Sequence, residues 1–237
     1  MSTAAVIPAA GRGLRLGPGA PKALRSLGGV PMLVHAVRAM TRSPAVSLVV
    51  VVAPSDGVAE VRALLGGHGL PEDKDLRIVA GGETRQESVR LGLAALPEDV
   101  DIVLVHDAAR PLVPVEIVDA VVAAVRDGAP AVVPGLPLAD TVKQIDPATN
   151  AVTGTPERAL LRAVQTPQGF RRDVLATAHA TVPGDGEGAT DDAGMVERTG
   201  VQVVVVPGHE EAFKVTRPLD LVLAEAVLAR RRATDDL

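Results

Sequence analysis

Short apolar runs alternate along this 237-residue chain with longer stretches in which apolar residues recur at helical spacing. The runs predict strands at Ala4–Ile7, Leu48–Ala53, Arg77–Val79, Asp101–Val105, Ala131–Val133 and Val201–Val206. The longer stretches predict helices at Pro31–Thr41, Gly57–Leu65, Thr84–Leu96, Pro114–Arg126, Arg172–Ala180 and Pro218–Arg231, with each leading proline in the first helical turn. Strands that are apolar on both faces and alternate with helices are typical of a parallel sheet covered on both sides. We therefore expect one α/β domain over residues 1–237, built on a mostly parallel twisted sheet.

Composition excludes several classes of protein. The chain has no cysteine, which excludes disulfides, a thiolate nucleophile and a cysteine-based zinc site. Its net charge of −5, with no tryptophan or tyrosine and two phenylalanines, argues against a nucleic-acid-binding protein. The first residues have no basic segment before the apolar ones, and no apolar run reaches the roughly 18 residues of a membrane span. A cytoplasmic enzyme with no membrane partner is the expectation.

One segment breaks the alternation. Residues Asp140–Thr155 contain two short threonine- and valine-rich stretches around Asp146–Asn150, which predicts a β-hairpin. A two-stranded ribbon is marginally stable alone in water, so it needs something to pack against. Either a second subunit or the same domain could supply that surface.

The loop after the first predicted strand is rich in glycine and positive charge. Gly11 and Gly13 allow a close backbone approach to an anion. A dinucleotide fingerprint would require glycine where Leu16 stands. The loop carries three cations instead, Arg12, Arg15 and Lys22, which suit a triphosphate better than a pyrophosphate. The alternative is a flexible turn with solvated cations.

Two later strand ends also carry candidate residues. Gly81–Ser88 opens a helix, where Thr84 and Glu87 fit a capping box and Ser88 could hydrogen-bond a base. Asp107 follows the fourth strand, where a carboxylate can contact Mg²⁺ or a ribose, and Arg110 could reach a phosphate. The alternatives are a well-formed turn at Thr84 and a capping role for Asp107.

The other polar candidates have plain structural explanations on pattern alone. His106 has no carboxylate and nucleophile to form a hydrolytic triad, so a packed histidine is favoured. Asp191 and Asp192 are expected to cap a short helix. Lys214 could be either a ligand or a solvated surface lysine.

Several motifs together resemble the 2-C-methyl-D-erythritol 4-phosphate cytidylyltransferases of the non-mevalonate isoprenoid pathway. The matching segments are PAAGRGLR with APK, GGETRQESV, VHDAARP, DTVK, AVQTPQGF, ATDDAG and FKVTRPLDL, in family order across nearly the whole chain. The resemblance implies a Rossmann-like nucleotidyltransferase fold in a stand-alone form. It also implies transfer of CMP from CTP to 2-C-methyl-D-erythritol 4-phosphate with release of pyrophosphate. The departures, such as Ala23-Leu24 after Lys22, remove no charge.

The resemblance assigns roles to individual positions. Arg15, Lys22, Arg158 and Lys214 match catalytic cations. The CTP pocket matches Pro8, Ala9, Ala10, Gly11, Gly13, Gly82, Glu83, Ser88, Asp107 and Ala108. Acceptor contacts match Asp107, Arg110, Thr141, Arg158, Thr190 and Lys214. Mg²⁺ is implied as a cofactor held mainly by the CTP phosphates. A homodimer is also implied, in which the 140–155 arm crosses to the partner and supplies Thr141 and Arg158 in trans.

Two other functions fit parts of the pattern. A pentitol-phosphate cytidylyltransferase, such as one for ribitol 5-phosphate, would share the CTP loops and differ in the acceptor. A non-catalytic nucleotide-binding module would be expected to lack a phosphate-loop cation or the strand-end carboxylate, yet Arg15, Lys22 and Asp107 are all present.

Overall fold

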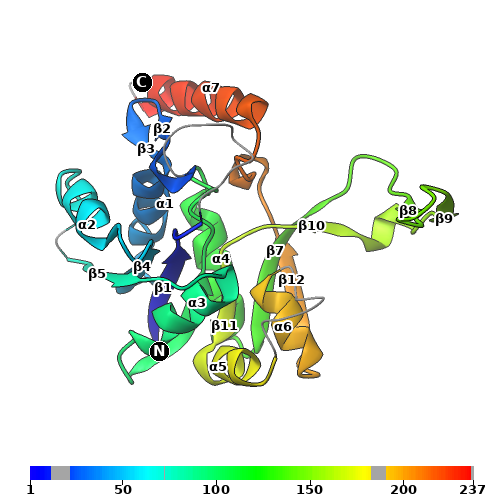
Figure 1. Cartoon of the computed structure of the whole chain (residues 1–237), viewed down its shortest axis with the longest axis horizontal. Helices are drawn as coiled ribbons and strands as arrows, with labels where there is room; N and C mark the ends of the chain where they lie inside the picture. The colour runs from blue at the N-terminus through cyan, green and yellow to red at the C-terminus, as the bar shows by residue number, and fades with distance from the viewer. Residues whose placement is uncertain (12–21, 72, 183–190, 236–237) are drawn as a thin grey trace.

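The chain folds around one eight-stranded sheet. The computed structural model describes residues 1–11, 22–71, 73–182 and 191–235 (Figure 1). The parallel strands are β1 (Ser2–Pro8), β4 (Leu48–Ala53), β5 (Asp75–Ala80), β6 (Val100–Val105), β7 (Ala131–Pro137) and β12 (Val203–Pro207). Strand β11 (Gln168–Arg171) runs antiparallel between β6 and β7, and β10 (Arg162–Val164) continues antiparallel along β7. The order is β10-β7-β11-β6-β1-β4-β5, with β12 also paired to β7.

Helices cover the two faces of this sheet: α1 (Met32–Thr41), α2 (Val58–Gly66), α3 (Arg85–Ala94), α4 (Val115–Arg126), α5 (Arg172–Thr181) and α6 (Asp192–Arg198). Helix α7 (Pro218–Asp235) packs instead in a separate cluster with Leu27, Met32 and Val215. No helix among the described residues is long and apolar enough to cross a membrane. The predicted α/β fold with a mostly parallel sheet is confirmed.

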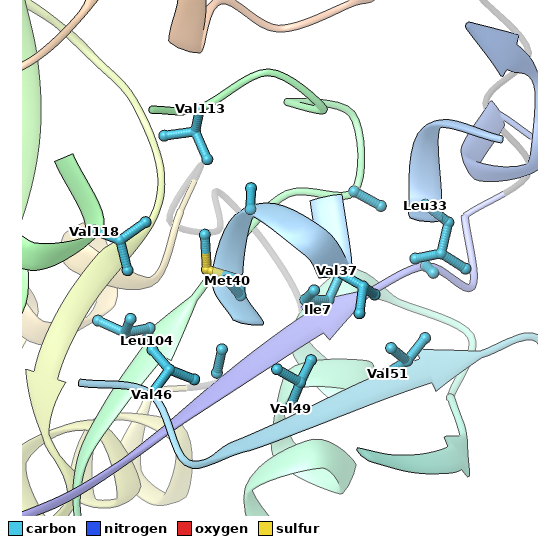
Figure 2. Close-up of a cluster of buried hydrophobic side chains, with 14 of the residues drawn as sticks. Ile7, Leu33, Val37, Met40, Val46, Val49, Val51, Leu104, Val113 and Val118 are labelled. Atoms are coloured by element: carbon cyan, nitrogen blue, oxygen red, sulfur yellow. The ribbon is translucent and has the colours of Figure 1, made fainter. Parts of the chain in front are cut away.

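Alternate residues of each central strand enter two separate cores. Ile7, Val49 and Leu104 pack with helices α1, α2 and α4 on one face, as Figure 2 shows for Met40 of α1 and neighbouring residues. The intervening strand residues pack with α3, α5 and α6 on the other face. Each fully buried valine or leucine stabilises the fold by about 1.5–3 kcal/mol, so both faces contribute and neither tolerates a charged residue.

The structure corrects two local predictions. Pro31 and Pro114 precede α1 and α4 in an extended conformation, with ψ of 141° and 148°, and are not the first helical residues. Strands β10 and β11 and the small hairpin of β2 (Ser26–Leu27) and β3 (Val30–Pro31) were not predicted. These segments are short and contain glycine, proline or charge, so their hydrophobic pattern is weak.

Residues between β7 and β10 extend away from the sheet (Figure 1). At their far end β8 (Gln144–Ile145) and β9 (Val152–Gly154) form an antiparallel ribbon. Its turn is held by Asp146, whose carboxylate accepts the Ala148 N–H at 2.7 Å, while Asn150 adopts a positive φ of 55°. The ribbon lies at the place where the sequence predicts a hairpin arm.

Candidate active site

A pocket opens at the carboxyl ends of β1, β5 and β6, the edge at which parallel α/β sheets bind ligands. Its lining is Pro8, Ala9, Ala10, Gly11, Ala23, Gly82, Glu83, Thr84, Arg85, Ser88, Asp107, Ala108, Ala109 and Lys214. Much of this lining is backbone and alanine, because three strand-end loops converge there. Most of the residues matched to a CTP pocket, together with Lys214, therefore lie around one hollow.

Other predicted site residues lie elsewhere. Gly13, Arg15 and Thr190 are outside the described residues, as is the side chain of Lys22, whose backbone begins the short 3-10 helix η2 (Lys22–Leu24). Thr141 and Arg158 are exposed in the excursion that carries the ribbon, and neither lines the pocket. Within one subunit the structure does not bring these two residues to Asp107.

The turn from β5 into α3 forms one wall of the pocket. Thr84 caps α3 as predicted, accepting the Glu87 N–H at 3.0 Å, while the Glu87 carboxylate accepts the Glu83 N–H at 2.9 Å. The Ser88 hydroxyl accepts the Gly82 N–H at 3.2 Å. A Cβ atom on Gly81 would lie 2.9 Å from both Ala10 and the Ser88 oxygen, so glycine is required for this close approach.

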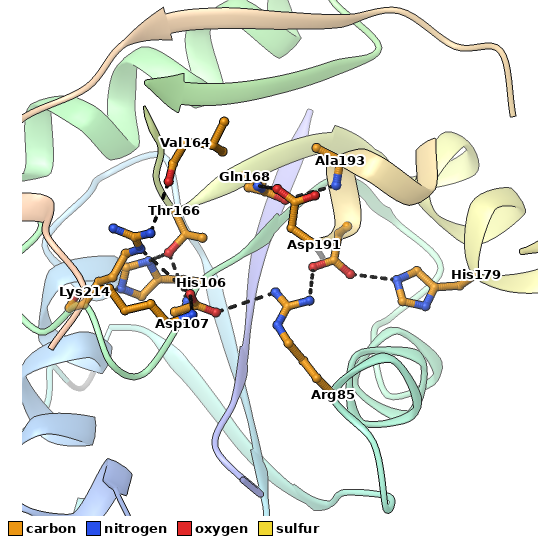
Figure 3. A network of polar contacts seen from close by, with 12 residues as sticks. Arg85, His106, Asp107, Val164, Thr166, Gln168, His179, Asp191, Ala193 and Lys214 are labelled. Atoms are coloured by element: carbon orange, nitrogen blue, oxygen red, sulfur yellow. Dashed lines mark hydrogen bonds and ion pairs between the residues drawn. The ribbon is translucent and has the colours of Figure 1, made fainter. Parts of the chain in front are cut away.

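Asp107 lies at the centre of a group of cations on the opposite wall (Figure 3). Its Oδ2 atom is 2.7 Å from Lys214 Nζ and 3.8 Å from Arg110 Nε, and its Oδ1 atom is 3.6 Å from Arg85 Nη2. Burial alone would raise the pKa of Asp107, but Lys214 and Arg85 together lower it to about 2. Asp107 is therefore ionised at neutral pH.

Arg85 joins Asp107 to a buried carboxylate on α6. Its Nη1 atom lies 2.7 Å from Oδ2 of Asp192, which is fully buried and also receives His179 Nε2 at 2.9 Å. The Arg85 guanidinium and the Asp192 carboxylate therefore form a close ion pair. Burial lowers the pKa of Arg85, but Asp192 and Asp107 outweigh it and raise that pKa above its usual value.

His106 is packed beneath this group, as predicted. It is fully buried, its Nε2 faces the Arg110 carbonyl at 3.1 Å, and its Nδ1 faces the Thr166 hydroxyl at 3.1 Å. A carbonyl only accepts, so Nε2 carries the proton. Burial lowers the pKa of His106 to about 4, and the ring is neutral at physiological pH.

Arg110 is more constrained than its predicted role in binding a phosphate suggests. Its Nη1 and Nη2 atoms donate to the carbonyls of Ala212 and Val164. Its buried Nε faces Asp107 and has no hydrogen-bond partner in the part of the chain that the structure describes. Arg110 therefore acts on the pocket indirectly, through its ion pair with the Asp107 carboxylate that lines the pocket.

Sequence reasoning missed Arg85 as a site residue, although it lies in a quoted motif. Asp191 caps α6 as predicted, accepting the Gly194 N–H at 2.9 Å. Asp192 was also expected to cap, but it is the first residue of α6 and its carboxylate pairs with Arg85 and His179. The one available signal was a pair of adjacent aspartates, since a cap needs only one carboxylate.

A family model and curated relatives match nearly the whole chain. Residues 3–230 match the family model for 2-C-methyl-D-erythritol 4-phosphate cytidylyltransferase. Relatives given that name in Streptomyces avermitilis and Streptomyces coelicolor are 73% identical over 98% of this chain, covering 94% and 87% of their own lengths.

Solved structures agree with the sequence relatives. A 4-diphosphocytidyl-2C-methyl-D-erythritol synthase from Anaerococcus prevotii superposes with a TM-score of 0.83 at 28% identity, covering 96% of both chains. A 2-C-methyl-D-erythritol 4-phosphate cytidylyltransferase from Thermus thermophilus has a TM-score of 0.72 at 36% identity, covering 96% of this chain and 98% of that one. This chain belongs to the 2-C-methyl-D-erythritol 4-phosphate cytidylyltransferase family.

Proposed function

We propose that this enzyme transfers CMP from CTP to 2-C-methyl-D-erythritol 4-phosphate, with Asp107 at the point where nucleotide and acceptor meet. The observation that carries the proposal is the pocket itself. A wall of backbone and small side chains, suited to a nucleotide, faces an ionised carboxylate surrounded by Lys214, Arg85 and Arg110.

The reaction makes one bond and breaks one. A phosphate oxygen of the acceptor attacks the α-phosphorus of CTP, and the bond to the bridging oxygen of pyrophosphate breaks. The acceptor phosphate is already ionised at neutral pH, so no general base is required. This agrees with a neutral, buried His106 whose two ring nitrogens are both occupied.

The main barrier is the approach of two polyanions, so catalysis consists of positioning and charge stabilisation. Lys214 is 40% exposed and lines the pocket, and it can exchange Asp107 for an acceptor phosphate oxygen. Arg15 and Lys22, from the loop after β1, would neutralise the triphosphate. Lysine suits such a point contact, and arginine suits bidentate binding of a phosphate.

Magnesium would be held mainly by the triphosphate. Among the described residues no three acidic or histidine side chains gather into a metal site. The ionised Asp107 can supply a single oxygen ligand, and Mg²⁺ commonly uses one or two carboxylates together with substrate phosphates. When bound, Mg²⁺ would supply charge neutralisation at the phosphates.

The excursion between β7 and β10, which contains the 140–155 arm, supports a homodimer with shared sites. Its apolar side chains are exposed, with Leu160 78% and Val152 59% accessible, which is costly unless another surface covers them. Thr141 and Arg158, matched to acceptor contacts, do not line the pocket of their own subunit. A partner's arm crossing to this pocket would supply both residues in trans.

Pyrophosphate release tests the reaction directly. With Mg²⁺ and CTP, we expect release with 2-C-methyl-D-erythritol 4-phosphate and little with ribitol 5-phosphate, and none when ATP, GTP or UTP replaces CTP. Faster release with ribitol 5-phosphate would assign the alternative acceptor. No release with either acceptor would refute catalysis by this pocket.

A further inference from the structure

We propose that Arg85 is a positioning residue that holds Asp107 in place when Lys214 leaves it for the acceptor phosphate. The inference rests on the proposed function and adds a residue to it. Arg85 comes from the first turn of α3 and bridges two carboxylates from distant parts of the chain, Asp107 after β6 and Asp192 at the start of α6.

The need for such a residue follows from the burial of Asp107. Its side chain is 12% exposed, and its closest cation is Lys214 at 2.7 Å. A phosphate dianion that takes Lys214 removes that partner, and a buried carboxylate left without a cation is strongly destabilised. Arg85, facing the other carboxylate oxygen at 3.6 Å, and Arg110, whose Nε lies 3.8 Å from Oδ2, remain to compensate the charge.

Arg85 can do this because its own position is fixed. Asp192 is fully buried and is held on its other oxygen by His179, so it is a rigid anchor for the guanidinium. Arginine presents its donors in a rigid planar fork that spans two carboxylates, whereas lysine is a point charge on a flexible stem. Arg85 is 35% exposed and lines the pocket, so it acts at the site itself.

Without Arg85, only Lys214 and Arg110 of these three cations would compensate the Asp107 charge, and the acceptor phosphate would have to compete harder with Asp107 for Lys214. Arg85→Met should therefore lower kcat/KM for the acceptor by about 10- to 100-fold, the scale of a misplaced catalytic group. The KM for CTP should stay within about twofold, because the substitution is not expected to remove a contact that binds CTP in the ground state. Arg85→Lys should recover part of the loss.

A double-mutant cycle separates positioning from a general structural role. If Arg85 acts through Lys214, Arg85→Met should have little further effect in a Lys214→Met background. Additive losses, or an unchanged acceptor KM in Arg85→Met alone, would overturn the inference. The matched control is Arg90→Met on the same helix, since Arg90 is 58% exposed and, among the described residues, its ion pair is the one with Glu87 at 4.0 Å.

Folding is checked with a second variant. Asp192→Asn removes the anchor and can destabilise the core, whereas Arg85→Gln/Asp192→Asn removes both charges together. If the double variant melts like the wild type, its acceptor kcat/KM should still be reduced as in Arg85→Met. Normal acceptor kinetics in that variant would refute the role of Arg85. Absence of product with the wild type would instead refute the proposed function.

Discussion

The Thr166 hydroxyl lies 3.1 Å from the Nδ1 atom of His106 and accepts the backbone N–H of Asp107 at 3.1 Å. Since this hydroxyl accepts from Asp107, its proton is free to be donated to Nδ1, and the neutral ring donates from Nε2 to the Arg110 carbonyl. The backbone at the end of β6 is thereby fixed by a buried chain of hydrogen bonds. Protonation of His106 would make Nδ1 a donor and reverse the hydrogen bond to Thr166.

This arrangement predicts a pH dependence of stability. The pKa of His106 is lowered to about 4 in the folded chain, while the unfolded chain takes up the proton near its ordinary value of 6.5. Its contribution is complete above about pH 6.5 and is lost as the pH falls toward 4, because the unfolded state then binds more protons. Urea unfolding across this window should show a shallower loss for His106→Asn than for the wild type. His35, whose pKa burial also lowers, titrates in both proteins and cancels in the difference. Equal slopes would contradict the assignment.

Asp107 predicts a loss of stability of the same sign, in a more acidic window. Its folded pKa of about 2 is below the ordinary 3.8, so its contribution is present above about pH 4 and is lost as the pH falls through 2. Between pH 6 and pH 3 the wild type should lose more unfolding free energy than Asp107→Asn, which has no carboxylate to protonate. A larger loss in the variant would show that the Lys214 and Arg85 contacts do not stabilise the ionised form.

The two glycines before α3 predict a contrast between neighbouring substitutions. A Cβ at Gly81 meets Ala10, Ser88 and the Ala53 carbonyl within 3.1 Å, none of which can move freely. The three atoms nearest to a Cβ at Gly82 all belong to the flexible side chain of Glu87. Gly81→Ala should therefore cost about 1–3 kcal/mol of stability through overpacking, and Gly82→Ala about 1 kcal/mol through the disturbed cap. Thermal unfolding measures both losses of stability. The double variant Gly82→Ala/Glu87→Ala tells whether Glu87 is the obstacle, because without the Glu87 side chain the added methyl should cause no loss beyond that of Glu87→Ala alone.

Much of the sheet could be predicted because six of its strands are apolar runs with strong periodicity. The same logic placed Pro8–Gly11, Gly82 and Asp107 at one edge, since parallel strands all end there. It did not find β10 and β11. Their positions are set by pairing with β7 and β6, a long-range contact that leaves little trace in a segment such as Gln168–Arg171.

Charge networks were harder to predict than backbone turns. A capping residue such as Thr84 acts on atoms three residues away, so its role is visible locally. Arg85 acts on Asp107 and Asp192, and only the folded topology brings those three segments together. For the same reason the pattern around Lys214 could not decide between ligand and surface residue.

The loop cations predict a separation of activity from stability. Arg15→Ala and Lys22→Ala should each lower kcat by about 10²–10³, or about 3 kcal/mol, on the scale of a lost oxyanion donor. Their melting temperatures should change little, because the role proposed for these two cations is in binding the triphosphate and not in folding. Steady-state pyrophosphate release and thermal unfolding of the same preparations check both parts. Wild-type turnover in both variants would remove these residues from the catalytic site.

Mixed dimers test whether the arm completes the partner's site. If Arg158 acts in trans, a dimer of one Arg15→Ala subunit and one Arg158→Ala subunit contains one pocket with both defects and one with neither. Mixing the two inactive variants under exchange conditions should therefore restore activity. The matched control mixes Arg15→Ala with Lys22→Ala, whose positions belong to the same loop, so every pocket stays defective and no activity should return. If the test pair recovers no activity after exchange is verified by mass, Arg158 belongs to its own subunit's pocket or lies outside the site. Recovery in the control pair would show that Arg15 and Lys22 do not act in the same pocket, which would contradict the assigned loop.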